Sequence, residues 1–548
     1  MIRRVIIRRF KRFDEVTFDL PGHVVLAGPN NAGKTTVLQA IAAWKLAVSR
    51  WQQLNDFRKY GNRSGTSTYH QAPISRPTFY AVPLRVFDLL WRGRHDASPI
   101  EIDVHLGDGR RVAMELERSS TEQIYVRPAA STDPAAARDV KLDVVFVPAM
   151  TGLGTAEPVY QSPKIDQLLG QGKPGEVLRN LLVEAHRDDL AWAKLTESIQ
   201  RLFRCELVPP DATGADIVAD YRPSPGGPQF DIASAGAGFQ QILMLLTFLH
   251  TRPASVLLLD EPDAHLHMIL QDSIYGELRA VAAGSGSQLI MATHSEAIID
   301  SAEPREICIM LDRPRPLRDE MERERFKEAL AALSHTQIMK AMERPAVLYL
   351  EDFTDRDILR EWARVLGHPA HETLTGDLFW ERSSGHGDTG KHFQLLRLVR
   401  DELRGLEILD RDAKLHLPAV QDAGGLSRIR WSRYEIESYL VHPAAIKRFI
   451  KQKVGEAAAA EHVREAEAYM DRELPRGVVD DPLGDHAYLN SAKASRDILP
   501  GILQAAGLPE VQKPSFYEIA AGMLPEEIHP EVREKLDAIQ RAFGLSTP

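Results

Sequence analysis

The feature that most constrains this chain is the segment 28–36, Gly-Pro-Asn-Asn-Ala-Gly-Lys-Thr-Thr, which follows a short apolar run and precedes a helical pattern. It fits the pattern G-x-x-x-x-G-K-[ST], in which glycines let backbone N–H groups turn towards phosphates. The N-terminus of the following helix adds its positive dipole. We therefore predict an α/β fold that binds ATP, with Lys34 on the β- and γ-phosphates and Thr35 on Mg²⁺. The predicted nucleotide-binding residues are Asn30, Gly33, Lys34, Thr35 and Thr36.

A second motif is the run 255–261, Ser-Val-Leu-Leu-Leu-Asp-Glu. Apolar residues that end in two carboxylates are typical of a central parallel strand, which delivers the acids to the carboxyl edge of a sheet. We predict that Asp260 holds Mg²⁺ through water and that Glu261 orients or deprotonates the attacking water. The alternative is a buried strand with a polar end.

Two further patterns surround this strand. Ser234, Gly236 and Gly238 precede a helical run, and a serine with glycines at a helix N-terminus can bind phosphate. An ordinary glycine-rich turn would look the same. His294 follows the strand predicted at 288–293 and could offer an imidazole to the γ-phosphate, although a lone histidine is more often structural.

Together these segments resemble the ABC-type ATPase heads of the SMC, RecF and OLD families. The resemblance rests on FKRFDEVTFDLPGHVVLAGPNNAGKTTVLQAI, SAGAGFQQIL, LLLDEPDAHLH and MATHSEAIID and covers about residues 1–312. It implies that Ser234 and Gly236 of one head complete the ATP site of another, with His294 as the switch histidine. A homodimer or higher homo-oligomer is therefore expected.

The resemblance implies an ABC/RecF-like head, and the pattern of the chain predicts a second α/β unit after it. Strands are expected at 24–27, 100–106, 112–116, 140–147, 255–259, 288–293, 307–311 and 346–350, and helices at 35–46, 177–203 and 317–342. Residues 119–138 favour a loop. The predicted domains are an N-terminal lobe (1–150), a helical and possible dimerisation insert (151–230), a C-terminal lobe (231–315), a helical linker (316–344), a second α/β domain (345–450) and a helical end (451–548).

The second α/β unit carries its own acids. The run 346–350 ends at Glu351, and the run 406–409 ends at Asp410, with Asp412 two residues further on. If the two strands are parallel neighbours, these carboxylates converge on one crevice. Hard oxygen ligands of this kind suit Mg²⁺ or Mn²⁺, and two such ions can drive phosphodiester cleavage. A solvated row of acids is the alternative.

Here VLYLEDFTDRDIL, LEILDRDAK and RYEIESYL resemble a Toprim domain, over about residues 345–445. An ABC head followed by Toprim is the order of the OLD family, which includes the Gabija defence nuclease. The resemblance implies that Glu351 and Asp355 form one metal-ligand pair and Asp410 and Asp412 the second. Glu437, or Glu435 with less support, supplies a later acid. The sequence departs from the family at Asp352, where Toprim domains usually have glycine.

Composition sets limits on partners and compartment. With 67 basic against 77 acidic residues, the net charge of −10 excludes a polycationic nucleic-acid coat but permits a local basic groove. Two distant cysteines form neither a zinc site nor a disulfide framework. No apolar run is long enough for a membrane span, and we expect a cytoplasmic protein. Two sets of basic residues could touch DNA or nucleotide but are equally typical of ordinary surface: Arg3, Arg4, Arg8, Arg9, Lys11 and Arg12, and the loop from Arg382 through His386 to Lys391 and His392.

The sequence therefore predicts an OLD-type, ATP-regulated and metal-dependent DNA endonuclease, with anti-phage defence resting on family analogy alone. One alternative is a sensor ATPase whose inert Toprim-like half holds or releases a separate effector protein. Another is a DNA repair clamp of the SMC/RecF kind, which would not need the second set of acids.

Overall fold

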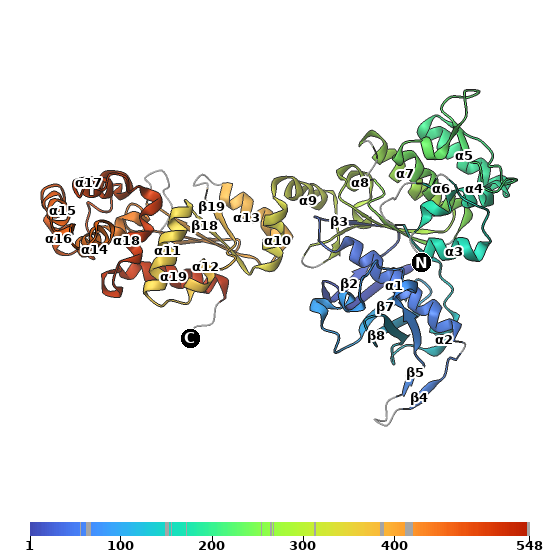
Figure 1. The fold of residues 1–548 in the computed structure, drawn as a ribbon, viewed down its shortest axis with the longest axis horizontal. Coiled ribbons are helices and arrows are strands. Elements are labelled where there is room, and N and C mark those ends of the chain that lie inside the picture. Colours follow the sequence, from blue (N-terminus) through green and yellow to red (C-terminus); the bar gives the residue numbers. More distant parts are fainter. Residues whose placement is uncertain are drawn as a thin grey trace. The chain divides into compact units, whose positions relative to one another are not determined.

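The computed structural model describes residues 1–54, 56–61, 67–147, 153–154, 156–170, 173–253, 255–263, 266, 268–311, 314–383, 388–411 and 420–544. The chain forms two compact units, Met1–Lys327 and Glu328–Pro548 (Figure 1).

The first unit is built on two six-stranded sheets. An antiparallel sheet has the order β2-β1-β7-β8-β9-β6, and a mostly parallel sheet has the order β10-β14-β15-β3-β16-β17. The antiparallel sheet contains β1 (Ile2–Phe10), β2 (Phe13–Asp19), β6 (Ala72–Ser75), β7 (Ile100–Leu106), β8 (Arg111–Arg118) and β9 (Gln123–Pro128). The parallel sheet contains β3 (Val24–Ala27), β10 (Val144–Val147), β14 (Val256–Asp260), β15 (Gln288–Thr293), β16 (Ile307–Ile309) and the antiparallel β17 (Arg315–Pro316).

Smaller elements complete this unit. Two short sheets are formed by β4 (Lys59–Gly61) with β5 (Ser67–Tyr69), and by β11 (Glu206–Leu207), β12 (Asp220–Arg222) and β13 (Phe230–Asp231). The helices are α1 (Lys34–Gln53), α2 (Pro134–Asp139), α3 (Ser162–Gly170), α4 (Leu178–His186), α5 (Asp189–Phe203), α6 (Ala237–Thr251), α7 (Met268–Gly284) and α8 (Glu296–Ser301), and α9 (Glu320–Ala332) spans the division between the units.

Helix α1 lies between the two large sheets and joins their cores. It contacts β14 and β15 on one side and β8 and β9 on the other, and Trp44 on this helix is fully buried. The indole N–H of Trp44 donates to the carbonyl of Val112 at 2.8 Å. Because one apolar cluster runs through both sheets and this helix, the loop before α1 is held on a rigid support.

The second unit has a five-stranded sheet of order β19-β18-β20-β22-β21, parallel except for the edge pair β21–β22. Its strands are β18 (Ala346–Leu350), β19 (Trp380–Arg382), β20 (Arg404–Leu409), β21 (Val420–Ala423) and β22 (Leu426–Arg430). Its helices are α10 (His335–Glu343), α11 (Phe353–Val365), α12 (Ala370–Thr375), α13 (Asp388–Val399), α14 (Pro443–Val454), α15 (Ala459–Glu473), α16 (Arg476–Asp480), α17 (Leu499–Ala505), α18 (Tyr517–Ala521) and α19 (Pro530–Phe543). Helices α11 and α19 pack on β18, and the C-terminal helices extend the same apolar core.

Most of the predicted elements are confirmed, and three predictions are wrong. The helix predicted at 177–203 is two helices, α4 and α5, because the Asp188 side chain caps the start of the second one. The loop predicted at 119–138 contains β9 and α2, because Ile124 and Val126 are buried and pair with β8 and β6. The helix predicted at 317–342 is two helices. Ser334 begins the second one with a capping box, in which its hydroxyl accepts from the Gln337 N–H and the Gln337 side chain accepts from the Ser334 N–H.

Candidate functional site

The segment 28–36 forms a tight turn between β3 and α1. Gly33 has φ +99°, and a Cβ there would lie 2.7 Å from the Phe13 ring, so a side chain would meet both strain and a clash. Gly28 passes close to the backbone of Met310, which follows β16. A Cβ at position 28 would lie 2.8 Å from the Met310 carbonyl oxygen. Glycine is therefore required at both positions by the path of the backbone.

Lys34 lies in the hollow that this turn encloses. Its side chain is buried, and its ammonium donates to the carbonyls of Gly28 at 2.7 Å and Pro29 at 3.0 Å. Burial lowers the pKa of Lys34, and the carboxylates of Glu261, Asp260 and Asp263 oppose that shift. The ammonium is thus only partly satisfied by neutral carbonyls and is placed to receive an anion.

The acids that follow β14 face the same turn. The Thr35 hydroxyl donates to Asp260 Oδ1 at 2.9 Å, and burial raises the pKa of Asp260 against this hydrogen bond. Glu261 has φ 47°, a left-handed backbone that is uncommon outside glycine, and its N–H donates to the Ala292 carbonyl at 2.8 Å. His294 Nδ1 lies 3.3 Å from Glu261 Oε1. These side chains meet at the carboxyl edge of β14 and β15.

A cavity of about 670 Å³ opens at this edge. We call it the nucleotide cavity, and it is lined by Arg12, Asn30, Asn31, Gly33, Lys34, Thr35, Thr36, Glu261 and His294. Arg12 is one of six basic residues whose place the sequence left open. Two others in that set have protein partners that do not line the cavity: Arg4 pairs with Asp19 at 2.6 Å, and Lys11 donates to Gln39 at 2.6 Å.

Asp263 is a supporting residue that the sequence did not single out. It is buried, and it accepts a hydrogen bond from the Thr293 hydroxyl at 2.8 Å. Burial raises the pKa of Asp263, whereas the Thr293 hydrogen bond lowers it. Thr293 directly precedes His294, so this contact fixes the end of β15 from which the histidine projects. The sequence feature that could have indicated Asp263 is its position two residues after Glu261 in the acidic motif.

Ser234 and Gly236 are exposed and are not among the described residues that line the nucleotide cavity. They belong to residues 231–236, here called the signature loop, which ends at the N-terminus of α6. The Ser234 hydroxyl donates to the Asp231 carbonyl at 2.6 Å. Within one chain, therefore, the structure does not bring Ser234 to Lys34.

In the second unit, acids gather where the parallel strands β18 and β20 end. We define the acid cluster as Glu351, Asp355, Asp410 and Glu437. Burial raises the pKa of Asp410, and a hydrogen bond with Glu351 and the charges of Asp355 and Glu437 raise it further. Burial, together with Glu437, also raises the pKa of Asp355 to about 7. The four carboxyl groups are thus electrostatically coupled.

Lys513, from the C-terminal helical region, contacts this cluster. Its ammonium lies 2.8 Å from Glu437 Oε1, and Glu437 is fully buried. Burial alone would lower the pKa of Lys513, but Glu437, Asp355 and Glu435 raise it overall. Nothing in the local sequence indicated this lysine, because it lies more than seventy positions after Glu437 and outside every motif.

Glu435 has hydrogen-bond and ion-pair partners of its own outside the acid cluster. The Ser495 N–H donates to Glu435 Oε1 at 2.5 Å, and Lys493 lies 3.9 Å from the other oxygen. Glu437, by contrast, has no hydrogen-bond partner for Oε2 among the described residues. Of the two acids in this segment, Glu437 is the one coupled to Asp355 and Asp410.

Asp352, the departure from the Toprim pattern, begins helix α11. Its φ of −144° is extended backbone that any residue adopts, so glycine is not required there. Its carboxylate accepts from the Phe353 N–H at 2.7 Å, while Asp355 accepts from the N–H groups of Glu351 and Asp352 at 3.2 Å each. Asp352 is therefore occupied as a helix cap.

The donor types in the cluster suit Mg²⁺ or Mn²⁺, since all are carboxylates and one buried oxygen of Glu437 is unbonded. As the side chains lie, no three Asp, Glu, His or Cys residues within the described ranges are gathered closely enough to hold a metal ion. Asp412 lies outside the described residues. So does His386 of the basic loop, whereas His392 is bonded through Nδ1 to the Tyr349 hydroxyl at 2.9 Å.

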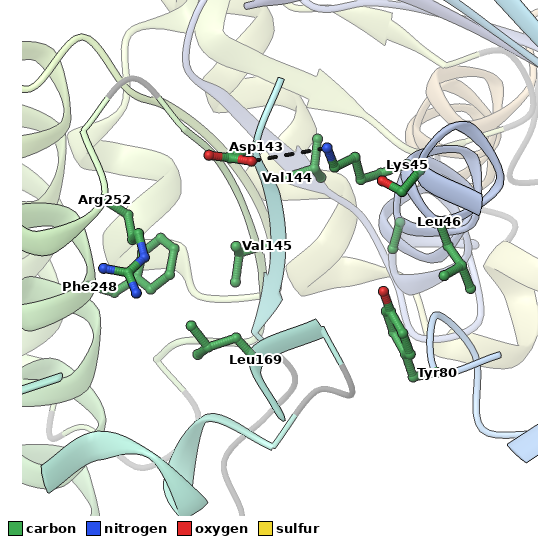
Figure 2. Close-up of a pocket in the computed structure, with 11 residues that line it drawn as sticks. Lys45, Leu46, Tyr80, Asp143, Val144, Val145, Leu169, Phe248 and Arg252 are labelled. Atoms are coloured by element: carbon green, nitrogen blue, oxygen red, sulfur yellow. Dashed lines mark ion pairs between the residues drawn. The ribbon is translucent and has the colours of Figure 1, made fainter. Parts of the chain in front are cut away.

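A second cavity, of about 270 Å³, lies between α1 and the edge strand β10 (Figure 2). Lys45 points from α1 towards Asp143, with the charged atoms 4.0 Å apart, and burial lowers the pKa of Lys45. Arg252, also in its lining, pairs with Glu184 at 2.7 Å. Because each of these charged side chains has an opposite charge beside it, ion pairing within the protein accounts for their presence in the cavity lining.

Comparison with known proteins identifies a family for the first unit. The sequence model of the family described as “AAA domain, putative AbiEii toxin, Type IV TA system” matches residues 24–300. The chain belongs to this family. The AAA match begins at β3 and ends within α8, so it includes Lys34, Asp260, Glu261 and His294. Residues 24–300 are therefore a P-loop ATPase domain of AAA type, which implies nucleotide and Mg²⁺ binding.

Solved structures similar to this AAA protein include SMC head domains. The Smc head domain of Pyrococcus furiosus, with an extended coiled coil and bound to the C-terminal domain of ScpA, is 13% identical at a TM-score of 0.35, over 58% of this chain and 94% of that one. The SMC head domain of Thermotoga maritima is 15% identical at a TM-score of 0.32, over 58% and 99%. A likeness of this degree carries no argument about activity, assembly or partners.

No curated protein matches the AAA chain. Across the parts that the structure describes, every helix is too short or too polar to span a lipid bilayer.

Proposed function

We propose that this protein is an ATP-regulated, metal-dependent DNA endonuclease of the OLD type, in which residues 345–450 form a Toprim-like nuclease domain. The observation that carries the proposal is the acid cluster at the carboxyl ends of β18 and β20. Parallel strands bring Glu351 and Asp410 to one edge, and a parallel-sheet edge of this kind is a usual place for a ligand site. A role in anti-phage defence follows from family analogy alone.

The ATPase half divides its work between Lys34 and Glu261. Lys34 binds the β- and γ-phosphates in place of the two carbonyls that it now contacts. Thr35, directly, and Asp260, through water, would hold Mg²⁺, which would neutralise charge on the phosphates. Glu261 orients the attacking water, and His294, beside it at 3.3 Å, contacts the γ-phosphate.

The ATPase site is shared between two chains in this proposal. Ser234 is exposed and absent from the described lining of its own nucleotide cavity, which leaves it available to complete the site of a second copy, as the resemblance to ABC-type heads implies. The assembly that this proposal requires is a homodimer or a larger homo-oligomer. ATP binding then joins two chains, and hydrolysis releases them.

In the nuclease half, Glu351, Asp355, Asp410 and Glu437 would hold Mg²⁺ or Mn²⁺, together with Asp412. Such ions, when bound, stabilise charge on the attacking and leaving oxygens of a phosphodiester. The carboxylates position the ions, and the raised pKa of Asp355, about 7, means that this carboxyl must give up a proton to become a ligand.

The test is a plasmid-cleavage assay of the purified protein in Mg²⁺ or Mn²⁺, with and without ATP. The proposal expects nicking or linearisation that depends on the metal ion and changes with ATP. A Lys34→Ala variant should keep the metal requirement and lose the response to ATP. Absence of cleavage of supercoiled, linear and single-stranded DNA under all these conditions would contradict the nuclease proposal.

A second candidate is a sensor ATPase whose Toprim-like unit is inert and holds an effector protein. Lys513 favours it, since a lysine ammonium already neutralises part of the acid cluster. The described residues also contain no ready group of three metal ligands. An effector that co-purifies with the protein and leaves on ATP hydrolysis, with no DNA cleavage, would favour this candidate.

A further inference from the structure

The signature loop is held by a buried arginine from a different helix. Arg179 on α4 is 2% exposed, and its guanidinium makes two parallel bonds to Asp231, from the two terminal nitrogens to the two carboxylate oxygens, each 2.9 Å long. Burial would raise the pKa of Asp231, but the Arg179 and backbone hydrogen bonds lower it overall. Such a bidentate pair fixes direction as well as distance.

Asp231, held by Arg179, in turn fixes the position of Ser234. Its Oδ1 also accepts from the Ala233 N–H at 2.7 Å, which caps the short turn Ile232–Ser234. Its carbonyl accepts from the Ser234 hydroxyl at 2.6 Å. Arg179, Asp231 and Ser234 thus form a continuous chain of contacts that runs from a buried arginine, through a half-buried carboxylate, to an exposed serine.

The other end of this chain is anchored as well. Glu157 is buried, and it accepts from the backbone N–H of Arg179 at 3.0 Å and of Asn180 at 2.7 Å. A distant carboxylate therefore caps α4 where the arginine projects. From the opposite side, the Gln240 amide donates to the carbonyls of Ile232, Ala233 and Ala235 at 3.2, 3.0 and 2.9 Å.

We propose that Arg179 is a positioning residue for the ATPase reaction: it holds the signature loop in the shape in which Ser234 meets the γ-phosphate bound by another chain. The inference rests on the shared site proposed above. It goes further by assigning Arg179 to the signature loop, which a chain contributes to the ATP site of its partner, and not to the chain's own nucleotide cavity. The cost of ordering this loop is met in the free chain, before two chains meet.

The assignment predicts a specific kinetic defect. Arg179→Met should leave ATP affinity of the single chain within about twofold of wild type and lower kcat by about tenfold to a hundredfold, since displacement of a positioned group by about 1 Å has effects of this size. Arg179→Lys, which keeps the charge and loses the paired geometry, should recover only part of kcat. Arg252→Met is the matched control, because Arg252 also pairs with a half-buried carboxylate in this unit but does not contact the loop.

Mixing experiments decide on which half of the site Arg179 acts. Lys34→Ala mixed with Ser234→Arg tests the shared site itself, because one mixed interface keeps an intact cavity and an intact loop. Arg179→Met should then recover ATPase activity when mixed with Lys34→Ala, and should recover none with Ser234→Arg.

The outcomes separate the two proposals. If Lys34→Ala and Ser234→Arg do not complement in proven mixed assemblies, the shared site is wrong. If they do complement, but Arg179→Met recovers with Ser234→Arg or hydrolyses ATP normally alone, the assignment of Arg179 is overturned. Should Arg179→Met not fold, Asp231→Asn takes its place, since it keeps the cap on Ala233 and removes the charge that Arg179 binds.

Discussion

At the scale of single residues, the proposed ATPase reaction assigns Lys34 and Glu261 to different stages. In that proposal Lys34 contacts phosphate as soon as the nucleotide binds, whereas Glu261, on a left-handed backbone beside His294, acts on the water. A group that serves the ground state and a group that serves only the transition state can be told apart by separate measurements of binding and turnover.

Lys34→Ala should therefore abolish ATP binding, and with it hydrolysis. Glu261→Gln should bind ATP within about threefold of wild type and lose at least about a hundredfold in turnover, because only the catalytic step needs the carboxylate. Nucleotide binding by fluorescence and phosphate release would be followed in parallel, with thermal unfolding as the check on folding. Normal turnover in Glu261→Gln would contradict the assignment.

Lys513 allows a sharper test of the acid cluster. Lys513→Met leaves Glu437 as a buried carboxylate without its counter-charge, which should lower the free energy of unfolding by about 3 kcal/mol. Added Mn²⁺ should restore much of this loss, since a cation then replaces the ammonium. Lys493→Met is the control: its partner Glu435 keeps the Ser495 N–H, so little change is expected. A Lys513→Met protein that Mn²⁺ does not stabilise would count against a metal site.

The P-loop, both acidic strand ends and Glu437 could be predicted because each follows or adjoins a recognisable pattern. Lys513 and Arg179 could not be predicted in the same way, and Asp263 was missed although it lies two residues after Glu261. Their importance comes from contacts across the fold: Lys513 meets Glu437, Asp263 meets Thr293, and Arg179 meets Asp231. For Lys513 and Arg179, the local sequence carries no sign that the partner is a carboxylate distant in the chain.

At the scale of elements, the pattern of apolar residues predicted strands correctly where a strand is long or wholly buried, as in β3, β15 and β18. It failed for β9, because the short alternation of Ile124 and Val126 lies among turn-forming residues and is stabilised only by its neighbours β8 and β6. The break between α9 and α10 could have been predicted, since Ser334 and Gln337 have the spacing of a capping box.

Helix α14 is joined to the segment before α19 by a paired arginine. Arg448 donates to both oxygens of Glu527, each at 2.8 Å, and the Leu524 N–H adds a third bond at 2.8 Å. Burial opposes ionisation, but the Arg448 bonds lower the pKa of Glu527 below its ordinary 4.5. Glu527→Gln should lower the free energy of unfolding by about 2 kcal/mol at pH 7.

The sign of the pH dependence follows from this lowered pKa. The carboxylate favours the folded state at every pH above about 4.5, and its contribution disappears as the pH falls through the lower, folded-state pKa. Urea unfolding of wild type and Glu527→Gln should therefore differ equally at pH 6 and 8 and converge below pH 4. Glu518→Gln, on a partly exposed pair with Lys453, is the control. A difference that grows in acid would refute this explanation.

At the scale of the whole molecule, both cysteines belong to the first unit. Burial raises the pKa of Cys205 to about 11 and of Cys308 to about 12, so about one Cys205 thiol in a thousand is ionised at pH 8. Since the sequence has only these two cysteines, thiol labelling reports on the unit that carries the nucleotide cavity.

Labelling by a chromogenic disulfide at pH 8 should be slow in the native protein and fast after unfolding. Mg-ATP at about a hundredfold its Kd should raise the free energy of the opening that exposes the thiols by about 2.7 kcal/mol in wild type. In Lys34→Ala it should not. Rapid labelling of the native protein, or equal protection by ATP in both proteins, would contradict the placement of the thiols or of the nucleotide.

The measurement that tests the central claim most directly is DNA nicking and ATP hydrolysis by Asp410→Asn, followed side by side with wild type. The substitution keeps the size of the side chain and removes a coupled carboxylate from the acid cluster, while Lys34 and Glu261 lie in the other unit. The account predicts that wild type nicks plasmid DNA in Mg²⁺ or Mn²⁺. Asp410→Asn should lose at least about a hundredfold in nicking and keep ATPase activity within about twofold. Equal nicking by the two proteins would contradict it, as would a wild type that cuts no DNA while hydrolysing ATP normally.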